Sequence, residues 1–500
     1  MSYKPVALIV LDGWGYREDP THNAVAAAKT PCFDGLWQEN PHALLEASGL
    51  AVGLPEGQMG NSEIGHTTIG AGTIIDTDLV QISKAIADGG FTINPAFNDL
   101  FAHVKKHDST LHVIGLISTG GIHSHSEHLY AFLRAAHQAG IHRLAIHAIT
   151  DGRDVAPRSG AQFLRELEEV LGELGIGHIA TVSGRFYAMD RDQNWHRLAK
   201  AEEALYGGEA VTHQRKASEV VQELYKEEKL DEHLEPVVLL DQEGKRYQIE
   251  KHDGIFIFNY RPDRVRMLSK RLHEKAKQDD IMLVTMTEYD STVPITTAFA
   301  PRKITTTLGA EISAAGLTQA HIAETEKFPH ATYFLNGGRQ EPYEGEEHVM
   351  LESRKDVTTH DQAPEMRAES IADAAIERIN QGVDFLFINF ANPDMVGHTG
   401  NVQAIITAVE TVDSQLCRVV EAVRAKGGVL LVTADHGNAE VNIDLGSGEV
   451  HTSHTLNPVP LIGVGLSGQL QNGSLADLAP TTLALLGLKQ PEAMTGKSLL

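Results

Sequence analysis

Carboxylate and imidazole side chains recur at short spacings in the 500-residue chain. Asp394 and His398 are four residues apart, so on a helical turn both would project from one face and could hold a metal ion. Asp435 and His436 are adjacent, a spacing that suits a loop around an ion. His454 follows shortly afterwards, and Asp12 adds a carboxylate near the N-terminus. Mixed nitrogen and oxygen ligands of this kind suit zinc, manganese or iron.

Each of these elements also has an ordinary structural explanation. An isolated Asp-x-x-x-His pair is more often surface chemistry than a metal site, and an aspartate after a strand usually caps a helix. However, Asp12, Asp394 and Asp435 each follow a short apolar run with the composition of a buried strand. If these strands share one sheet, three carboxylates and three imidazoles meet at its edge, and a purely structural role would leave them crowded and unpaired. The pattern therefore predicts a functional metal site.

Ser62 is the candidate nucleophile. It lies in the segment Gly60-Asn-Ser-Glu-Ile-Gly65-His66, where small residues let the backbone approach a ligand closely. A serine in such a segment can equally be a plain helix N-cap. A serine alkoxide is hard to form near pH 7, and metal coordination lowers that cost. Ser62 becomes a candidate nucleophile because a metal site is already predicted.

Arginines gather after the middle apolar runs. They are Arg153, Arg185, Arg191, Arg261 and Arg264, accompanied by Asp154 and His123. Pro262 suits the first turn of a helix, which would put Arg261 and Arg264 on one face. Most arginines form surface ion pairs, but guanidinium groups also bind carboxylate and phosphate in bidentate fashion. Because the chain has a net charge of −25, an anionic substrate needs a local cluster of positive charge, and anion binding is the better interpretation.

The elements that must position these residues follow an α/β pattern. Continuous apolar, β-branched runs alternate with amphipathic helical stretches, which predicts mainly parallel sheets covered on both faces. The predicted strands are Val6–Leu11, Leu111–Ser118, Arg143–Thr150, His178–Ser183, Ile255–Phe258, Ile281–Thr285, Phe385–Phe390 and Val429–Thr433. Ligands bind beyond the carboxyl ends of such strands. We predict a discontinuous metal-binding domain, residues 1–76 and 311–500, with a second α/β domain, residues 77–310, inserted.

Composition excludes several classes of protein. With 42% apolar and 22% charged residues, the chain is globular. Its acidic charge argues against nucleic-acid binding, which needs a basic face. No apolar run has the length of a membrane span, and the longest N-terminal one is too short for a signal peptide. Cys32 and Cys417 lie far apart in no C-x-x-C motif, so we expect two free thiols in a reducing cytoplasm.

Six motifs resemble those of the cofactor-independent phosphoglycerate mutases. They are Leu11-Asp-Gly-Trp-Gly15, Met59-Gly-Asn-Ser-Glu-Ile-Gly-His66, Asp151-Gly-Arg-Asp154, Asn392-Pro-Asp-Met-Val-Gly-His398, Thr433-Ala-Asp-His-Gly-Asn438 and His454-Thr455. The resemblance extends over nearly the whole chain. The metal motifs and the closing Leu478-Ala-Pro-Thr-Thr-Leu also resemble the wider alkaline phosphatase superfamily.

The resemblance implies a phosphatase-like domain with two divalent ions, commonly manganese, and an inserted phosphotransferase domain. It assigns Asp394, His398 and His454 to one ion and Asp12, Ser62, Asp435 and His436 to the other. It assigns substrate contacts to His123, Arg153, Asp154, Arg185, Arg191, Arg261, Arg264 and Lys327. Lys327 is chosen from the resemblance alone. His451 falls outside the matching ligand position, and ligand type does not distinguish manganese from zinc or cobalt.

The reaction implied is the interconversion of 3-phosphoglycerate and 2-phosphoglycerate in glycolysis and gluconeogenesis, without 2,3-bisphosphoglycerate. Ser62 would take the phosphoryl group, and the captive glycerate would reorient and take it back on its 2-hydroxyl, with Asp154 as acid and base. The domains are expected to close and exclude water. We expect a cytoplasmic monomer whose partner is the small phosphoglycerate substrate, with no nucleic acid and no membrane.

Three other functions fit parts of the sequence. A phosphatase or another phosphomutase of the same superfamily would keep the metal residues but not the arginine-bearing insert. A sulfatase is disfavoured because no Cys/Ser-x-Pro-x-Arg motif occurs. A histidine-rich metal buffer without turnover would need neither a serine between glycines nor arginines at several strand ends.

Overall fold

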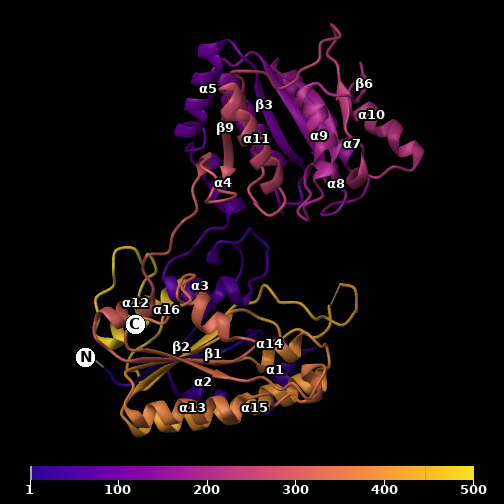
Figure 1. Ribbon diagram of the computed structural model, residues 1–500. Coiled ribbons are helices and arrows are strands. Elements are labelled where there is room, and N and C mark those ends of the chain that lie inside the picture. The colour runs from indigo at the N-terminus through magenta and orange to yellow at the C-terminus, as the bar shows by residue number, and fades with distance from the viewer. Residues whose placement is uncertain (1–2, 445) are drawn as a thin grey trace. The chain divides into compact units, whose positions relative to one another are not determined.

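The chain folds into two compact α/β units, as the sequence predicts for the fold class (Figure 1). The computed structural model describes residues 3–444 and 446–500. The first unit combines the residues up to Thr77 with Lys303–Leu500, and the second is Asp78–Arg302. The predicted domain bounds, after residues 76 and 310, lie close to these crossings. Within the described ranges, no helix is both long and apolar enough to cross a membrane.

The first unit is built on an eight-stranded sheet. Its strands are β1 Val6–Leu11, β2 His42–Glu46, β11 Gln319–Glu324, β12 Glu346–Leu351, β13 Phe385–Phe390, β14 Val429–Thr433, β15 Val459–Val464 and β16 Gly473–Ser474, in the order β12-β11-β13-β1-β14-β15-β2-β16. Only β15 runs antiparallel to its neighbours. The helices are α1 Ala24–Ala27, α2 Pro31–Glu39, α3 Ser62–Ala71, α12 Leu308–Ala314, α13 Ala368–Gln381, α14 Asn392–Gly397, α15 Val402–Ala425 and α16 Leu478–Leu486. Helices α13 and α15 cover one face, and α3, α12 and α16 the other (Figure 1).

Strand β1 lies in the middle of this sheet because all six of its residues are apolar and buried. It pairs in parallel with β13 on one side and β14 on the other. In this register Leu11 lies opposite Phe390, and Val10 lies opposite Thr433. The three strands therefore end at the same edge, and the residues that follow them emerge side by side.

The second unit has an eight-stranded sheet of its own. Its strands are β3 Leu111–Ile117, β4 Leu144–Thr150, β5 His178–Gly184, β6 Val211–His213, β7 Val237–Leu239, β8 Gly254–Ile257, β9 Met282–Thr287 and β10 Thr296–Phe299, in the order β10-β9-β8-β3-β4-β5-β7-β6. Only the β5–β7 pair is antiparallel. The helices are α4 Asp78–Ala87, α5 Pro95–His107, α6 Ser126–Gln138, α7 Gly160–Leu174, α8 Arg185–Ala188, α9 Trp195–Tyr206, α10 Ala217–Leu224 and α11 Arg266–Asp279. Two apolar cores flank the sheet, one formed with α5, α6, α7 and α10 and the other with α9 and α11.

All eight predicted strands are confirmed, with ends that differ by at most two residues from the predicted ones. The predicted helix start at Pro262 is wrong, because α11 begins at Arg266. Arg261 and Arg264 therefore lie in the turn before the helix and not on one helical face. The carbonyl oxygen of Pro262 accepts hydrogen bonds from the backbone N of Val265 and Arg266, which form the turn that leads into the helix.

Cys32 and Cys417 form a disulfide, so the prediction of two free thiols is wrong. The bond joins α2 to α15 across 385 positions of sequence, with the two Cα atoms 5.7 Å apart. Asp413, one helical turn before Cys417, accepts hydrogen bonds from the backbone N of Cys32 and Phe33. These bonds dock the start of α2 on α15 and bring the two sulfur atoms together, a proximity that sequence distance does not reveal.

Reducing this disulfide is expected to lower the free energy of unfolding by roughly 2–5 kcal/mol, the usual range for loss of a native cross-link. The unfolded chain regains conformational freedom when the link between α2 and α15 is broken. Thermal unfolding with and without dithiothreitol measures the change. The Cys417→Ser variant is the control, since its unfolding should not respond to the reductant. An equal response in both proteins would contradict the prediction.

Candidate active site

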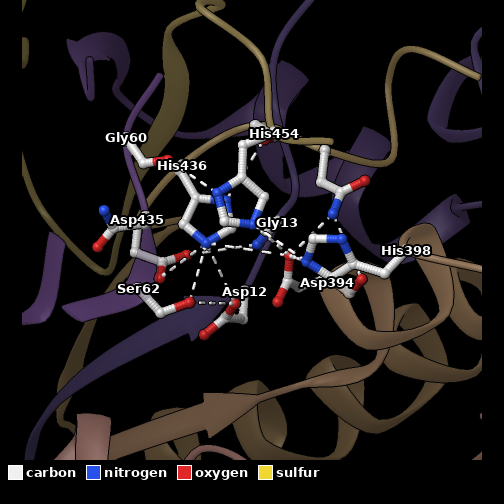
Figure 2. A network of polar contacts seen from close by, with 12 residues as sticks. Asp12, Gly13, Gly60, Ser62, Asp394, His398, Asp435, His436 and His454 are labelled. Carbon is white, nitrogen blue, oxygen red and sulfur yellow. Dashed lines mark hydrogen bonds and ion pairs between the residues drawn. The ribbon is translucent and has the colours of Figure 1, made fainter. Parts of the chain in front are cut away.

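Charged side chains of the first unit converge beyond the carboxyl ends of β1, β13 and β14 (Figure 2). Asp12 follows β1 directly, and Asp394 lies in the first turn of α14, just after β13. Asp435 and His436 lie in the loop after β14. All four residues are at most 2% exposed. The parallel register of the three strands brings the predicted carboxylates together.

Two imidazoles complete one side of this cluster. His398 ends α14, and its Nε2 lies 3.1 Å from Nε2 of His454. Both Nε2 atoms are 3.2 Å from Asp394 Oδ1. Nδ1 of His398 lies 2.7 Å from the carbonyl oxygen of Thr452, and Nδ1 of His454 lies 2.8 Å from that of Gly60. Because a carbonyl only accepts, each Nδ1 donates the proton, and both Nε2 lone pairs face the same point beside Asp394.

Ser62 lies on the other side of the cluster. Its Oγ is 3.0 Å from His436 Nε2 and 3.4 Å from Asp12 Oδ1. His436 Nε2 is also 3.4 Å from Asp435 Oδ2. Ser62 is the first residue of α3, whose N-cap is Asn61, so the N-cap alternative for Ser62 is wrong. The N-terminus of a helix favours negative charge, which suits an ionised or phosphorylated serine.

Lys327 is buried in the middle of these residues. Its Nζ donates to Asp12 Oδ1 at 2.7 Å, to Ser62 Oγ at 2.6 Å and to Asp394 Oδ2 at 2.5 Å. Burial by itself lowers the pKa of an ammonium group, but the carboxylates of Asp12 and Asp394 outweigh burial and raise the pKa of Lys327. The structure thus places Lys327 beside the serine hydroxyl.

The cluster carries more negative than positive charge. Burial and the neighbouring Asp435 raise the pKa of Asp12. At Asp394 burial acts in the same direction, but Lys327 and the imidazoles of His398 and His454 together hold the pKa well below its ordinary value. Asp435 Oδ2 accepts no hydrogen bond from any described residue. Buried anions need compensating cations, and the donor atoms fit divalent metals. Sets of donors within 4.8 Å of one another are Asp394, His398 and His454; Asp12, Asp394 and His436; and Asp12, His66 and Asp435.

Two side chains that the sequence did not single out orient the cluster. His66 lies one helical turn after Ser62, with its Nδ1 2.8 Å from Ser62 O and 3.3 Å from Asp435 Oδ2. Asn389 Nδ2 donates to Asp12 Oδ2 at 2.8 Å and lies 3.0 Å from His66 Nε2. The spacing of four from Ser62 is a signal that could have identified His66. Asn389 has no such signal, because it lies within an apolar buried strand.

Of two further polar residues in the chain after β14, Asn438 contacts the cluster and His451 does not. Asn438 Nδ2 donates to Asp394 Oδ1 at 2.8 Å. His451 belongs to none of the possible metal-binding groups of the described chain, and its Nδ1 has no hydrogen-bond partner there. Of the two histidines in His451-Thr-Ser-His454, only His454 contacts the cluster.

In the second unit, Arg185 and His123 lie with two aspartates beyond the carboxyl ends of β3, β4 and β5. Arg185 Nη1 donates to Asp151 Oδ1 and to Asp154 Oδ2, both at 2.6 Å. His123 Nε2 lies 3.7 Å from Asp154 Oδ2, and its Nδ1 has no hydrogen-bond partner in the described residues. Burial and the positive charge of Arg185 lower the pKa of His123 to about 4, so this imidazole is neutral near pH 7.

Arg264 is the arginine with free hydrogen-bonding capacity. Among the described residues it makes no hydrogen bond or ion pair, although its side chain is half-buried. Burial and the positive charges of Arg185, Arg191 and Arg153 lower its pKa. The three exposed arginines of the group pair with acids: Arg191 and Arg261 with Asp263, and Arg153 with Glu232. Like charges gathered in this way favour a bound anion.

Comparisons with known proteins identify the family. Residues 4–490 match the Metalloenzyme superfamily. The chain is 46% identical over 536 residues to the 2,3-bisphosphoglycerate-independent phosphoglycerate mutase of Chloroflexus aggregans, covering 99% of this chain and 98% of that one. The protein of the same description from Clostridium botulinum is 45% identical over 510 residues, covering all of both chains. The chain belongs to the 2,3-bisphosphoglycerate-independent phosphoglycerate mutases.

A solved structure of this family supports the assignment. The phosphoglycerate mutase of Leishmania mexicana, solved at low cobalt concentration, is 32% identical to this chain and superposes with a TM-score of 0.58. The match covers 100% of this chain and 98% of the Leishmania protein. The resemblance inferred from the six motifs is therefore confirmed, and the chain is an enzyme of the mutase family rather than a metal buffer.

Within this mutase, the predicted site residues form two groups. The predicted metal residues Asp12, Ser62, Asp394, His398, Asp435, His436 and His454 lie together in the first unit, with Lys327 among them. The predicted substrate residues His123, Arg153, Asp154, Arg185, Arg191, Arg261 and Arg264 lie in the second unit. The acidic partners Asp151, Asp263 and Glu232 were not singled out from the sequence.

Proposed function

We propose that this mutase interconverts 3-phosphoglycerate and 2-phosphoglycerate through a phosphoserine on Ser62, without 2,3-bisphosphoglycerate. The observation that supports this most is the environment of Ser62 Oγ, which lies 2.6 Å from Lys327 Nζ and 3.0 Å from His436 Nε2. A hydroxyl at a helix N-terminus, beside a buried ammonium group, is suited to carry negative charge and then a phosphate.

In the first half-reaction, Ser62 Oγ, already deprotonated beside the Lys327 ammonium group, attacks the phosphorus of 3-phosphoglycerate. A bond forms between Oγ and phosphorus, and the bond from phosphorus to the C3 oxygen breaks. Lys327 stabilises the negative charge on Oγ through its ammonium group. Asp154 donates a proton to the departing C3 oxygen, so glycerate leaves the phosphorus with a neutral hydroxyl.

Divalent ions fit the charge and the donor atoms of this cluster. We assign Asp394, His398 and His454 to one ion and Asp12, Ser62, Asp435 and His436 to a second, with manganese as the proposed metal. The opposed Nε2 lone pairs of the two histidines and the excess of buried carboxylates support this assignment. Such ions neutralise charge on the transferred phosphoryl oxygens.

In the second half-reaction, the glycerate 2-hydroxyl attacks the phosphoserine. Asp154 takes the proton from this hydroxyl and returns to the state in which it began. Arg264 and the arginines around it hold the glycerate carboxylate, so the molecule can turn without escaping. The Oγ–phosphorus bond of Ser62 breaks, and 2-phosphoglycerate is released.

Incubation with 3-phosphoglycerate and Mn²⁺, with no 2,3-bisphosphoglycerate added, tests this function. We expect 2-phosphoglycerate to accumulate towards equilibrium with little free phosphate. Chelation with EDTA should stop the reaction, and Mn²⁺ should restore it. Free phosphate as the main product would instead favour a phosphatase of the same superfamily.

Arg264→Ala is expected to raise the KM for 3-phosphoglycerate by roughly 10–100-fold, the cost of removing a hydrogen bond to a charged group. Arg264 is chosen because no acid among the described residues forms an ion pair or hydrogen bond with its guanidinium group. Steady-state kinetics measure the effect. Arg158→Ala removes an exposed arginine of the same unit and is the matched control. An unchanged KM in Arg264→Ala would contradict the role of Arg264.

We also infer that the enzyme acts as a cytoplasmic monomer whose partner is its phosphoglycerate substrate. The two clusters together supply the nucleophile, the metal ligands and the arginines that the proposed reaction needs, which supports a monomer. The glycolytic nature of the substrate supports the cytoplasm. Light scattering coupled to size exclusion tests the monomer, and a dimeric mass would overturn it.

A further inference from the structure

A second group of possible metal ligands lies at the opposite edge of the second unit's sheet. Helix α5 ends at His107 shortly before β3, His252 lies just before β8, and Asp280 lies just before β9. Strands β9, β8 and β3 are neighbours and run parallel. The three residues therefore emerge side by side at the amino ends of these strands, whereas the arginines follow the carboxyl ends.

Their donor atoms are close enough to share one ion. One ring nitrogen of His107, one of His252 and one carboxylate oxygen of Asp280 lie within 4.8 Å of one another. The rings of His107 and His252 stack with centroids 4.6 Å apart. His252 Nδ1 is 3.0 Å from Asp280 Oδ2. His103, one turn earlier on α5, places its ring 4.7 Å from that of His107.

The ligand atoms are also available. His107 makes no side-chain hydrogen bond or ion pair with the described part of the chain, and the Nε2 of His252 has no hydrogen-bond partner there. Asp280 is exposed, and both imidazoles are half-buried, so an ion can enter from solvent.

A third group of this kind, in the first unit, is different. Glu346 accepts hydrogen bonds from Asn336 and from the backbone N of Tyr343, and it pairs with His348. Both ring nitrogens of His321, the remaining member, are within hydrogen-bond distance of other groups. In this third group the carboxylate and the ring nitrogens just described already have partners within the protein, so an ion would have to break those bonds.

We propose that His107, His252 and Asp280 form a surface binding site for a transition metal ion such as Zn²⁺, separate from the cluster around Ser62. Two imidazoles and a carboxylate are ligands that zinc commonly takes, with water in the remaining position. The bound ion would tie together the end of α5 and the loops before β8 and β9. It would lie about a strand length, roughly 20 Å, from the arginine group, so turnover should not depend on it.

Equilibrium dialysis against Zn²⁺ tests the site, with bound metal counted per chain. Wild type is expected to bind one more Zn²⁺ than His107→Ala or His252→Asn. Asparagine is chosen at His252 because the backbone there has a φ of +69°, which asparagine tolerates. The affinity of this extra ion should fall at least roughly tenfold, the lower limit seen for loss of a supporting metal contact.

His137→Ala is the matched control, since His137, like His107, lies in the last turn of a helix of the same unit, α6, and its side chain is exposed. It should bind as much Zn²⁺ as wild type. All three variants should keep wild-type mutase activity in Mn²⁺, which shows that they fold and that the Ser62 cluster is intact. Wild-type zinc stoichiometry and affinity in His107→Ala would overturn the proposal.

Discussion

Ser62→Ala is expected to abolish mutase turnover, lowering kcat by roughly ten-thousand-fold or more, as loss of a nucleophile does in other enzymes with covalent intermediates. Without Oγ, no bond to phosphorus can form, and Lys327 has no anion to stabilise. The substitution should leave the fold unchanged, because Asn61, not Ser62, caps α3. Formation of 2-phosphoglycerate, followed through coupling to enolase, measures the loss.

Two observations make this prediction specific. Ser48→Ala alters another serine of the same unit, whose Oγ donates only to a backbone carbonyl, and it should retain wild-type activity. After incubation with 3-phosphoglycerate and acid quenching, mass spectrometry should find one added phosphoryl group on the peptide that contains Ser62. Substantial turnover by Ser62→Ala, or a phosphorylated peptide elsewhere, would refute the mechanism.

Asp394→Asn is expected to lower kcat by roughly 10²–10³-fold and to release bound metal, a loss comparable with removing one strong electrostatic contact to the transition state. Its Oδ1 lies 3.2 Å from Nε2 of both His398 and His454. Its Oδ2 accepts from Lys327 at 2.5 Å. The neutral amide keeps the shape of the side chain but not the charge that attracts a cation.

Metal content after dialysis, measured by mass spectrometry of the elements, checks this prediction alongside kcat. Asp373→Asn is the control, because this carboxylate is on the surface of α13 and pairs only with Arg418 among the described residues. It should keep both metal and activity. Full metal content in Asp394→Asn would show that Asp394 is not a ligand, and the assignment of the ions would have to change.

Much of the candidate site follows from local sequence. Strand β1 consists of six apolar residues and ends at Asp12, and β14 ends just before Asp435 and His436. Continuous apolar runs are typical of parallel strands buried on both faces, and the carboxyl ends of parallel neighbours share an edge. The local pattern of apolar runs and the carboxylates that follow them therefore predicts that Asp12, Asp394 and Asp435 meet if their strands share one sheet.

The position of Lys327 could not be derived in this way. Lys327 follows β11, whose sequence Gln-Ala-His-Ile-Ala-Glu has no apolar run although every residue is buried. Its polar side chains bond to partners far along the chain: Gln319 Nε2 donates to Gly309 O, and Glu324 Oε2 accepts from Ser353. Local hydrophobicity predicts a strand only where burial is apolar, so it does not predict β11, and only the family resemblance points to Lys327.

The sequence by itself determined the α/β class, the main strands and the type of chemistry, because these depend on short-range patterns of apolar and polar residues. Only the tertiary structure decided that Lys327 contacts Ser62, that Arg264 makes no ion pair among the described residues, and that Cys32 meets Cys417. These facts depend on which strands and helices become neighbours. Neighbour order is set by packing of the whole chain, and no local pattern encodes it.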